Sequence, residues 1–522
     1  MKNHLLLTTL FLLSIATNAA NSGVCGDGVT YSYDSSSKIL SINKTDEGSG
    51  EMTDYDFADY HQGTSRAPWF NTDIRSVVIG DGVTRIGNYA FYLCNAANIT
   101  LPSSMISIGY SAFYNCNKLA TLNIPNGVRA IEGYAFSGCE TLESIEIPES
   151  VTLLGSGAFS GCFKLQSATL PSKIESIEDN LFYGCRYLTS IVIPNKVTTI
   201  KADAFYGCSG LVSISIPNSV TSIGDEAFRN CTGLKRVNIS DIGSWCKIDF
   251  ENYGNPLYYA HHLFINDNEI HDLVIPDDIV SIKSRAFCGF SELQSISFGA
   301  SVTSIEEDAF LACTSLKDVN IPQNVTSIGG EAFADCTGLL HVSLPTSLST
   351  IIRSTFNGCS KLESISIPEG VQLIETKAFY GCSNLKIIRI SSSVKTIQLS
   401  AFFGCNNISD VYCYGITPPN HGGYYKRDVS HMFMSSSFKA ATLHVPESAI
   451  DAYKDENNAY PWCDFGSIVL LTDEETGISA TSIKSNINEQ YFTIDGKRIN
   501  NPHKGVTIVK MSNGQTKKII VK

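Results

Sequence analysis

Residues 142–165 read LESIEIPESVTLLGSGAFSGCFKL, and variants of this stretch recur thirteen times along the chain. Each copy holds a phenylalanine, and successive phenylalanines are 23 residues apart, except for one step of 22 and one of 59. A fixed period of about 20 to 29 residues is typical of a leucine-rich solenoid, whose coils bury their apolar faces only by stacking. The thirteen are Phe91, Phe113, Phe136, Phe159, Phe182, Phe205, Phe228, Phe287, Phe310, Phe333, Phe356, Phe379 and Phe402.

The first half of the quoted unit predicts a strand. Ile145 and Ile147 alternate with Ser144 and Glu146, so the isoleucines face the core and the polar residues face outward. Pro148 ends the strand because it has no N–H for the ladder.

The second half predicts a short helical turn. Ala158, Phe159, Cys162 and Leu165 have the spacing i, i+1, i+4 and i+7, which places them on one side of such a turn. We therefore expect an α/β solenoid, a right-handed leucine-rich repeat spiral with a parallel sheet on one face and a small all-β module at the C-terminus.

The cysteines form a second column. One unit has Phe290 in this position, so the position behaves as an apolar core position, and we predict free, buried thiols. Neighbouring coils about 4.7–4.9 Å apart also allow disulfides by distance, whereas a metal site is disfavoured because ligands in a line do not converge. Twelve of the seventeen cysteines share the register: Cys94, Cys116, Cys139, Cys162, Cys185, Cys208, Cys231, Cys313, Cys336, Cys359, Cys382 and Cys405.

Composition bounds the function. The 522 residues are 43% hydrophobic and 17% charged, which indicates a folded chain. The net charge of −13 argues against nucleic acid as a partner. Residues 477–522 hold eight Lys or Arg and two acidic residues, a balance of +6, which leaves −19 for the rest.

The N-terminus resembles a secretory signal peptide over residues 1–19. Lys2 precedes an apolar run from Leu5 to Ile15, and small residues follow up to a cleavage point after Ala19. A buried helix is the alternative, and a lipoprotein is disfavoured because Cys25 lies beyond the apolar run. No later segment has 18 uninterrupted apolar residues, so we do not expect an integral helical membrane protein.

The remaining chain divides by pattern. We expect an N-terminal cap over residues 20–73, repeats over 74–413, a C-terminal cap over 414–472 and a small β module over 477–522. Enlarged, divergent units at about 240–272 contain Trp245, Phe250, Tyr258, Tyr259 and Phe264. We interpret them as an aromatic plug, and a binding lip is the alternative.

The repeat consensus resembles a known family. The motifs Ile216-Pro217, Val220 to Gly224, Glu226-Ala227-Phe228 and Cys231 to Leu234 are similar to those of BspA-type leucine-rich repeat proteins. The resemblance covers about residues 74 to 470. These are surface proteins of Bacteroides-like bacteria, also found in some parasitic protists. It implies an exported adhesin or interaction protein at the cell surface or outside the cell, and some members bind host matrix proteins such as fibronectin or fibrinogen.

The basic tail has its own resemblance. Residues 490–498, 502–510 and 517–522 look like the C-terminal sorting segments of Por-type secretion substrates in the same bacteria. A small β module that merely ends the chain is the alternative.

Nothing in the sequence indicates catalysis. The chain lacks His-Glu-x-x-His, a phosphate-binding loop and a Gly-x-Ser-x-Gly turn, so we expect no enzyme activity, cofactor or bound metal. Outward strand positions mostly hold small hydroxyl residues. The exceptions that we select as candidate ligand-binding residues are Arg236, Ile387, Arg389, Asp410 and Tyr412. We predict a binding protein for an extracellular protein or glycan, with a structural scaffold of the cell envelope as the alternative.

Overall fold

The computed structural model describes residues 21–56, 66–421 and 431–472, together with the backbone of strands between residues 490 and 521. The predicted signal peptide lies outside these residues. The chain divides into two compact units, residues 1–470 and residues 471–522. Within the described part, no helix is both long enough and apolar enough to cross a bilayer.

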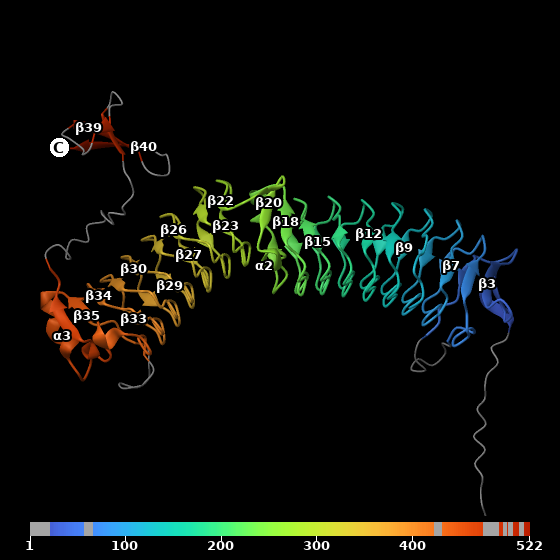
Figure 1. The fold of residues 1–522 in the computed structure, drawn as a ribbon, viewed down its shortest axis with the longest axis horizontal. Helices are drawn as coiled ribbons and strands as arrows, with labels where there is room; N and C mark the ends of the chain where they lie inside the picture. Colours follow the sequence, from blue (N-terminus) through green and yellow to red (C-terminus); the bar gives the residue numbers. More distant parts are fainter. Residues whose placement is uncertain are drawn as a thin grey trace, which may run out of the picture. The chain divides into compact units, whose positions relative to one another are not determined.

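The first unit is a solenoid whose coils stack side by side from the N-terminal strands to the C-terminal helix (Figure 1). Nearly every coil places one strand on a face that we call the front sheet; the coil of residues 119–125 has no assigned strand there, and the strands fall into several consecutive groups. Neighbouring strands within a group pair in parallel and in register, as Ser144 with Ser167 and Arg389 with Tyr412. The strands are β5 (Ser76–Ile79), β7 (Asn98–Thr100), β10 (Ser144–Glu146), β12 (Ser167–Thr169), β14 (Ser190–Ile191), β16 (Ser213–Ser215), β18 (Arg236–Ile239), β20 (Leu263–Ile265), β22 (Asp272–Val274), β24 (Ser295–Ser297), β26 (Asp318–Asn320), β28 (His341–Ser343), β30 (Ser364–Ile367), β32 (Ile387–Ile390), β34 (Asp410–Cys413), β35 (Thr442–Val445) and β36 (Ser467–Leu470).

A second series of two-residue strands forms another side of each coil, the side sheet. Its strands pair in parallel with the same repeat, as Thr199 with Ser222. They are β6 (Arg85–Ile86), β8 (Ser107–Ile108), β9 (Ala130–Ile131), β11 (Leu153–Leu154), β13 (Ser176–Ile177), β15 (Thr199–Ile200), β17 (Ser222–Ile223), β19 (Asp249–Phe250), β23 (Ser281–Ile282), β25 (Ser304–Ile305), β27 (Ser327–Ile328), β29 (Thr350–Ile351), β31 (Leu373–Ile374) and β33 (Thr396–Ile397).

The wall that carries the phenylalanines differs from the predicted helical turn. It is a run of turns, because the residues two positions before and two positions after each phenylalanine have positive φ. In one coil these are Asp203 (φ 56°) and Gly207 (φ 70°), on either side of Phe205. A right-handed helix cannot continue through such residues. The Phe205 N–H instead donates to the Ala227 carbonyl of the next coil at 2.8 Å.

The phenylalanine rings form the interior of the solenoid, as predicted. Neighbouring rings are stacked, for example Phe136 and Phe159 with centroids 5.6 Å apart and planes at 3°. The column extends beyond the thirteen repeats, since Trp69 stacks on Phe91 at 5.7 Å and Phe433 stacks on Phe402 at 5.5 Å. Aromatic residues from both flanking segments therefore cover the ends of the core.

The cysteine column lies beside the rings. All seventeen cysteines are free thiols, and all but Cys463 are buried. Eleven of the twelve column thiols donate to the carbonyl of a phenylalanine in the preceding coil, as Cys162 Sγ does to Phe136 at 3.2 Å. These thiols thus add a hydrogen-bonded ladder to the core.

The N-terminal strands continue both sheets. Strands β1 (Ser22–Asp27), β2 (Val29–Asp34) and β3 (Ile39–Lys44) pair antiparallel in the order β1, β2, β3, and β4 (Glu51–Met52) pairs antiparallel with β1. Strand β3 then pairs in parallel with β5, and β4 with β6. This arrangement occupies the first edge of each sheet, which would otherwise expose unpaired backbone groups.

The enlarged units between Phe228 and Phe287 stay within the solenoid. They contain α1 (Ile242–Trp245), β19, α2 (Leu257–Ala260), β20 and β21 (Asn268–Glu269), which forms a hairpin with β20. Trp245 is 1% exposed, and its Nε1 donates to the Ala286 carbonyl at 2.8 Å. Trp69 makes the same contact with Ala90 at 2.7 Å, so each indole N–H replaces the phenylalanine N–H of a regular coil.

The C-terminal strands β35 and β36 extend the front sheet beyond the last repeat. Between and around them lie α3 (Ile450–Lys454) and three 3-10 turns, Phe438–Ala440, Glu447–Ala449 and Trp462–Asp464. Phe433, Phe438, Trp462 and Phe465 pack ring against ring over the end of the core. The second unit is an antiparallel sheet of β37 (Gln490–Thr493), β38 (Arg498–Ile499), β39 (Gly505–Lys510) and β40 (Thr516–Val521), in the order β38-β37-β39-β40.

Candidate functional site

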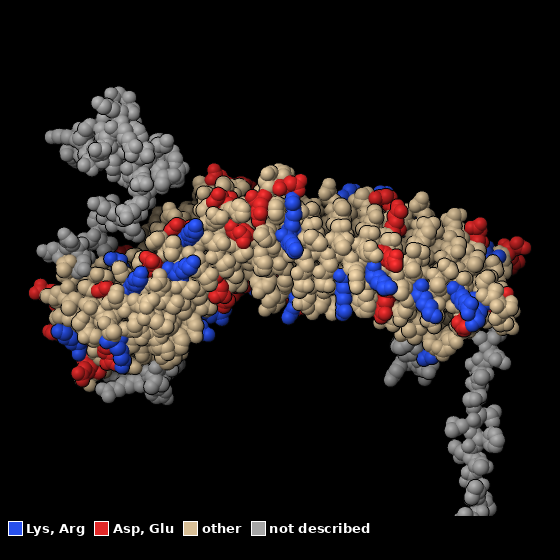
Figure 2. Space-filling model, in the orientation of Figure 1, with Lys and Arg blue, Asp and Glu red and all other residues tan. Residues whose placement is uncertain are grey.

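The outward side chains of the front sheet form two rows, because each strand presents alternate residues to solvent. Ser144, Ser167, Ser190 and Ser213 belong to the first row, and Thr169, Ser215 and Ser343 to the second. Figure 2 shows charged residues scattered over the visible face of the solenoid, with large neutral areas between them. A cluster of larger, charged or aromatic side chains on these rows is therefore a local exception to the pattern of small hydroxyl residues.

The largest departure lies on β32, β34 and β35. The Arg389 guanidinium carbon is 4.8 Å from the centroid of the Tyr412 ring. On its other side, Tyr412 stacks on the His444 ring at 4.2 Å, with the planes at 15°. The three planar groups thus form one continuous stack across three neighbouring strands. We call Ile387, Arg389, Asp410, Tyr412 and His444 the recognition patch.

A hydrogen-bond contact with Asp410 fixes the imidazole of this patch. His444 Nε2 lies 3.0 Å from Asp410 Oδ1, and the two side chains are 14% and 34% exposed. Desolvation acts to raise the pKa of Asp410, but hydrogen bonds from His444 and Ser409 and the charges of His444 and Arg389 together lower it. Asp410 is therefore an acceptor for His444, and this hydrogen bond holds the ring against Tyr412.

Strand alternation explains why these side chains meet. Ile388, Val411 and Leu443 are fully buried beneath the patch, so their neighbours along each strand must face outward. The parallel register places Arg389 beside Tyr412 and Tyr412 beside His444. Packing of the core thus sets the position of each patch residue.

Four of the five predicted candidate residues come together in this patch, and His444 was missed. The structure pairs Ile387 directly with Asp410, next to Arg389 and Tyr412. The signal for His444 was the alternation of Thr442-Leu443-His444-Val445 before Pro446, which matches the repeat strands. A 28-residue excursion, 414–441, separates β34 from β35 in sequence, and it obscures their contact in space.

Arg236, the fifth candidate, lies elsewhere on the front sheet, beside the β20–β21 hairpin. Its guanidinium carbon is 4.0 Å from the Phe264 centroid, it pairs with Asp267, and its Nε donates to Asn238. Asp267 is in the hairpin turn, so these contacts hold the hairpin against β18. The structure does not bring Arg236 together with the other four.

The adjacent histidines of the enlarged units, His261 and His262, contact different partners. His261 Nδ1 is 2.9 Å from the Gly289 carbonyl of the following coil, and His262 pairs with Glu269 in the hairpin. Asn255, which is 2% exposed, donates to the Arg285 carbonyl at 2.7 Å. These contacts and the buried Trp245 support the interpretation of this region as an aromatic plug.

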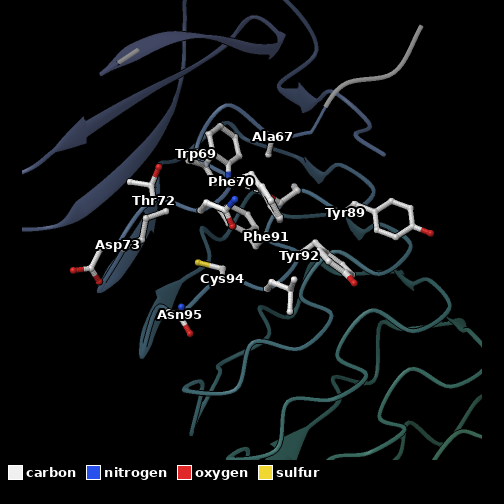
Figure 3. Close-up of a pocket in the computed structure, with 14 residues that line it drawn as sticks. Ala67, Trp69, Phe70, Thr72, Asp73, Tyr89, Phe91, Tyr92, Cys94 and Asn95 are labelled. Carbon is white, nitrogen blue, oxygen red and sulfur yellow. Dashed lines mark hydrogen bonds between the residues drawn. The ribbon is translucent and has the colours of Figure 1, made fainter. Parts of the chain in front are cut away.

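A cavity of about 230 Å³ lies near the N-terminal end of the solenoid (Figure 3). Trp69 and Phe91, the first two rings of the core column, line it, and Asp73 and Tyr89 lie on opposite sides. None of the five predicted site residues lines this cavity. The cavity adjoins the capped end of the core, so we interpret it as a result of how the cap packs on the first coil rather than as a binding site.

The recognition patch combines groups of the kinds that protein interfaces use. It presents the guanidinium donors of Arg389, the Tyr412 ring and the apolar, half-buried Ile387. Tyrosine and arginine are enriched where protein interfaces concentrate their binding energy. Among the residues that the structure describes, no group of three or more His, Cys, Asp or Glu side chains could hold a metal ion.

Solved structures of bacterial repeat proteins resemble this chain. A leucine-rich repeat protein from Bacteroides ovatus is 26% identical, with a TM-score of 0.50, over 70% of this chain and 94% of that one. A leucine-rich cell surface protein from Faecalibacterium prausnitzii is 25% identical, with a TM-score of 0.34, over 78% and 96%. The pneumococcal vaccine antigen PcpA is 19% identical, with a TM-score of 0.37, over 86% and 98%.

The comparison with curated proteins finds no match. The family model described as the BspA type leucine-rich repeat region matches residues 66–188, 175–254, 259–360 and 339–440. These matches cover well over half of the chain, and they agree with the repeat period and with the stacked coils. The chain therefore belongs to the BspA type leucine-rich repeat family.

Proposed function

We propose that this chain is exported and acts as a binding protein at the cell surface or outside the cell, without catalysis. The basic, apolar and small-residue segments of residues 1–19 support export. Family membership supports a role in binding, because a solenoid presents an extended, rigid surface to partners. The tail after residue 477 would then serve either as a sorting segment or as a terminal module.

The observation that carries the proposal is the stack of Arg389, Tyr412 and His444. Ordering three side chains on an exposed sheet costs conformational entropy, which the small hydroxyl residues of neighbouring coils avoid. Rigid aromatic and arginine groups supply contact area to a partner at little further entropic cost. The patch is thus pre-organised for binding.

The geometry favours a protein partner over a neutral glycan. Sugar rings pack against the open face of an aromatic ring, but both faces of Tyr412 are covered, one by Arg389 and the other by His444. A ligand would therefore meet the edge of the Tyr412 ring rather than its face. Contacts of this kind, together with the Arg389 guanidinium and the apolar Ile387, suit a protein surface.

Binding assays with the chain from residue 20 onward test this proposal. The protein is immobilised and exposed to fibronectin, fibrinogen, other matrix proteins and a glycan array. We expect saturable binding to a protein, weakened about thirtyfold by Tyr412→Ala, the scale of an interface hot spot. Ser297→Ala, on the second row of outward side chains but several coils away from the patch, is the matched control and should leave binding unchanged.

Two outcomes contradict the proposal. Saturable binding that is confined to glycans would assign the patch to carbohydrate. The absence of any saturable binding would favour the alternative of a structural scaffold, which the smooth hydroxyl rows of the front sheet suit. Protease treatment of intact cells tests the location, because a surface protein is degraded and a periplasmic one is protected.

A further inference from the structure

We propose that Arg389 receives a carboxylate from an aspartate or glutamate side chain in an acidic segment of the protein partner. This inference rests on the proposed function, and it names the chemistry that the recognition patch selects.

The first observation is that Arg389 has no ion pair among the residues that the structure describes. Asp410, its nearest acidic neighbour across the strands, pairs with His444 and acts on Arg389 only through its charge. Arg236, the other arginine on the outward rows, pairs with Asp267. Each arginine lies over an aromatic ring, Arg236 over Phe264 and Arg389 over Tyr412, but of the two only Arg389 has no ion pair with a described carboxylate.

The second observation concerns the space around the guanidinium. Tyr412 covers one face of Arg389 at 4.8 Å. On the side of Arg389 away from Tyr412, the next residue of the row is Ser366 on β30. Ser343 on β28 holds the same position one coil earlier. Both side chains are much shorter than arginine, so they leave its other side open above a floor of small hydroxyl groups. Arg389 thus lies at the boundary between short serine side chains on one side and the Tyr412 and His444 rings on the other.

The third observation is that Arg389 is half-buried and lies over an aromatic ring. A half-buried guanidinium is less well hydrated than an exposed one, and among the described residues none forms an ion pair with Arg389 to offset that loss. Stacking on a ring leaves the N–H groups of a guanidinium free at its edge, where they match the two oxygens of a carboxylate. A partner carboxylate above Ser366 would complete the pairing that Asp267 provides for Arg236.

Acidic glycans also carry carboxylates, but the surroundings of Arg389 favour a protein source. Ile387 lies next to Arg389 and is half-buried. Val469, which is 37% exposed, ends the row that contains Arg389, Tyr412 and His444. Apolar groups beside a charged anchor suit a peptide segment that combines an acidic and an apolar side chain. We therefore commit to an acidic protein segment as the occupant.

A peptide selection on the chain from residue 20 onward tests the inference. Random twelve-residue peptides on phage are selected against the immobilised protein, and the recovered sequences are synthesised with a fluorescent label. We expect an acidic residue in the selected peptides, and its replacement by the matching amide should weaken binding about tenfold or more. Arg389→Gln should remove that difference between acid and amide, and Arg389→Lys should retain part of it.

The control is Arg353→Gln, since Arg353 is 60% exposed and lies outside both outward rows of the front sheet. It should leave the difference between acid and amide unchanged. Polysialic acid and hyaluronate are added as competitors to distinguish acidic glycans from acidic peptides.

The outcomes separate this inference from the proposed function. Peptides that need Tyr412 but bind the Arg389→Gln variant as well as the unaltered protein would overturn the carboxylate while the proposed function stands. Binding that is restricted to the acidic polysaccharides would also overturn it. If neither peptides nor matrix proteins bind the unaltered protein, both proposals are wrong.

Discussion

The Sγ of Cys162 lies 3.2 Å from the carbonyl oxygen of Phe136 in the preceding coil. The same oxygen accepts the backbone N–H of Cys139 at 3.1 Å, so both of its lone pairs are used in a fully buried position. A thiol is a weak donor, but here it occupies the second lone pair of a buried carbonyl oxygen whose first lone pair accepts the Cys139 N–H. The cysteine column is thus part of the hydrogen bonding that joins the coils.

Replacement of one ladder thiol should lower stability. Cys162→Ala removes the donor to Phe136 and leaves a small void, so we expect the free energy of unfolding to fall by about 1–2 kcal/mol. Urea unfolding followed by circular dichroism measures the change. Ser144→Ala, on the exposed first row, should stay within about 0.5 kcal/mol of the unaltered protein. An unchanged midpoint for Cys162→Ala would show that the ladder contributes nothing.

Alkaline pH should unfold the solenoid steeply. Burial raises the pKa of ten column thiols, to about 12 for Cys231 and Cys405 and to about 11 for Cys94. An unfolded thiol ionises near its ordinary pKa of about 8.5. The stability that each thiol contributes is therefore complete below pH of about 8.5 and is lost as pH rises toward the folded pKa. Within that window each thiol lowers the free energy of unfolding by about 1.4 kcal/mol per pH unit.

Urea midpoints between pH 7 and pH 11 measure this effect. A variant with Cys185, Cys208 and Cys231 changed to alanine should start lower in stability but decline less steeply with pH. This comparison separates the thiols from the buried tyrosines, which also ionise at high pH. Equal slopes for the two proteins would contradict the assignment to the thiols.

The positions with positive φ beside each core phenylalanine should tolerate asparagine better than alanine. Gly207 has φ of 70°, and a Cβ there would meet the Gly184 backbone at 3.7 Å (Cα) and 3.9 Å (N), which are ordinary contacts. Gly207→Ala should therefore cost about 1–2 kcal/mol from backbone conformation alone. Gly207→Asn should cost less, because Asn115 and Asn230 hold the same position with φ of 56° and 61°. Thermal unfolding of both variants tests the order, and equal losses would contradict it.

The indole of Trp245 should anchor the enlarged units. Trp245→Phe keeps an aromatic ring but removes the donor to the Ala286 carbonyl, so we expect a loss of about 1–3 kcal/mol. Hydrogen exchange should increase in α1 and β19 and remain unchanged in distant coils such as those of β10 and β12. Uniform exchange throughout the solenoid would contradict a local anchoring role.

Much of the fold could be predicted because the partners of each residue recur at one period. Ser144, Ser167 and Ser190 occupy the same place in consecutive coils, so one unit describes the next. The helical turn of the wall was predicted wrongly, since apolar spacing alone does not show that residues such as Asp203 and Glu226 adopt positive φ. Their conformation follows from hydrogen bonds to the next coil, which spacing within one coil does not report.

The sequence by itself determined the coil, its inward and outward faces and its apolar core, because these depend on a pattern within 23 residues and on the need to bury it. It also located Ile387, Arg389, Asp410 and Tyr412 as departures from the hydroxyl rows. Only the tertiary structure decided that His444 completes their stack, since it lies 32 residues beyond Tyr412, outside the period. It likewise decided that Asp267 pairs with Arg236 and that Arg389 has no such partner in the described chain, because pairing across strands depends on register and on loops that do not repeat.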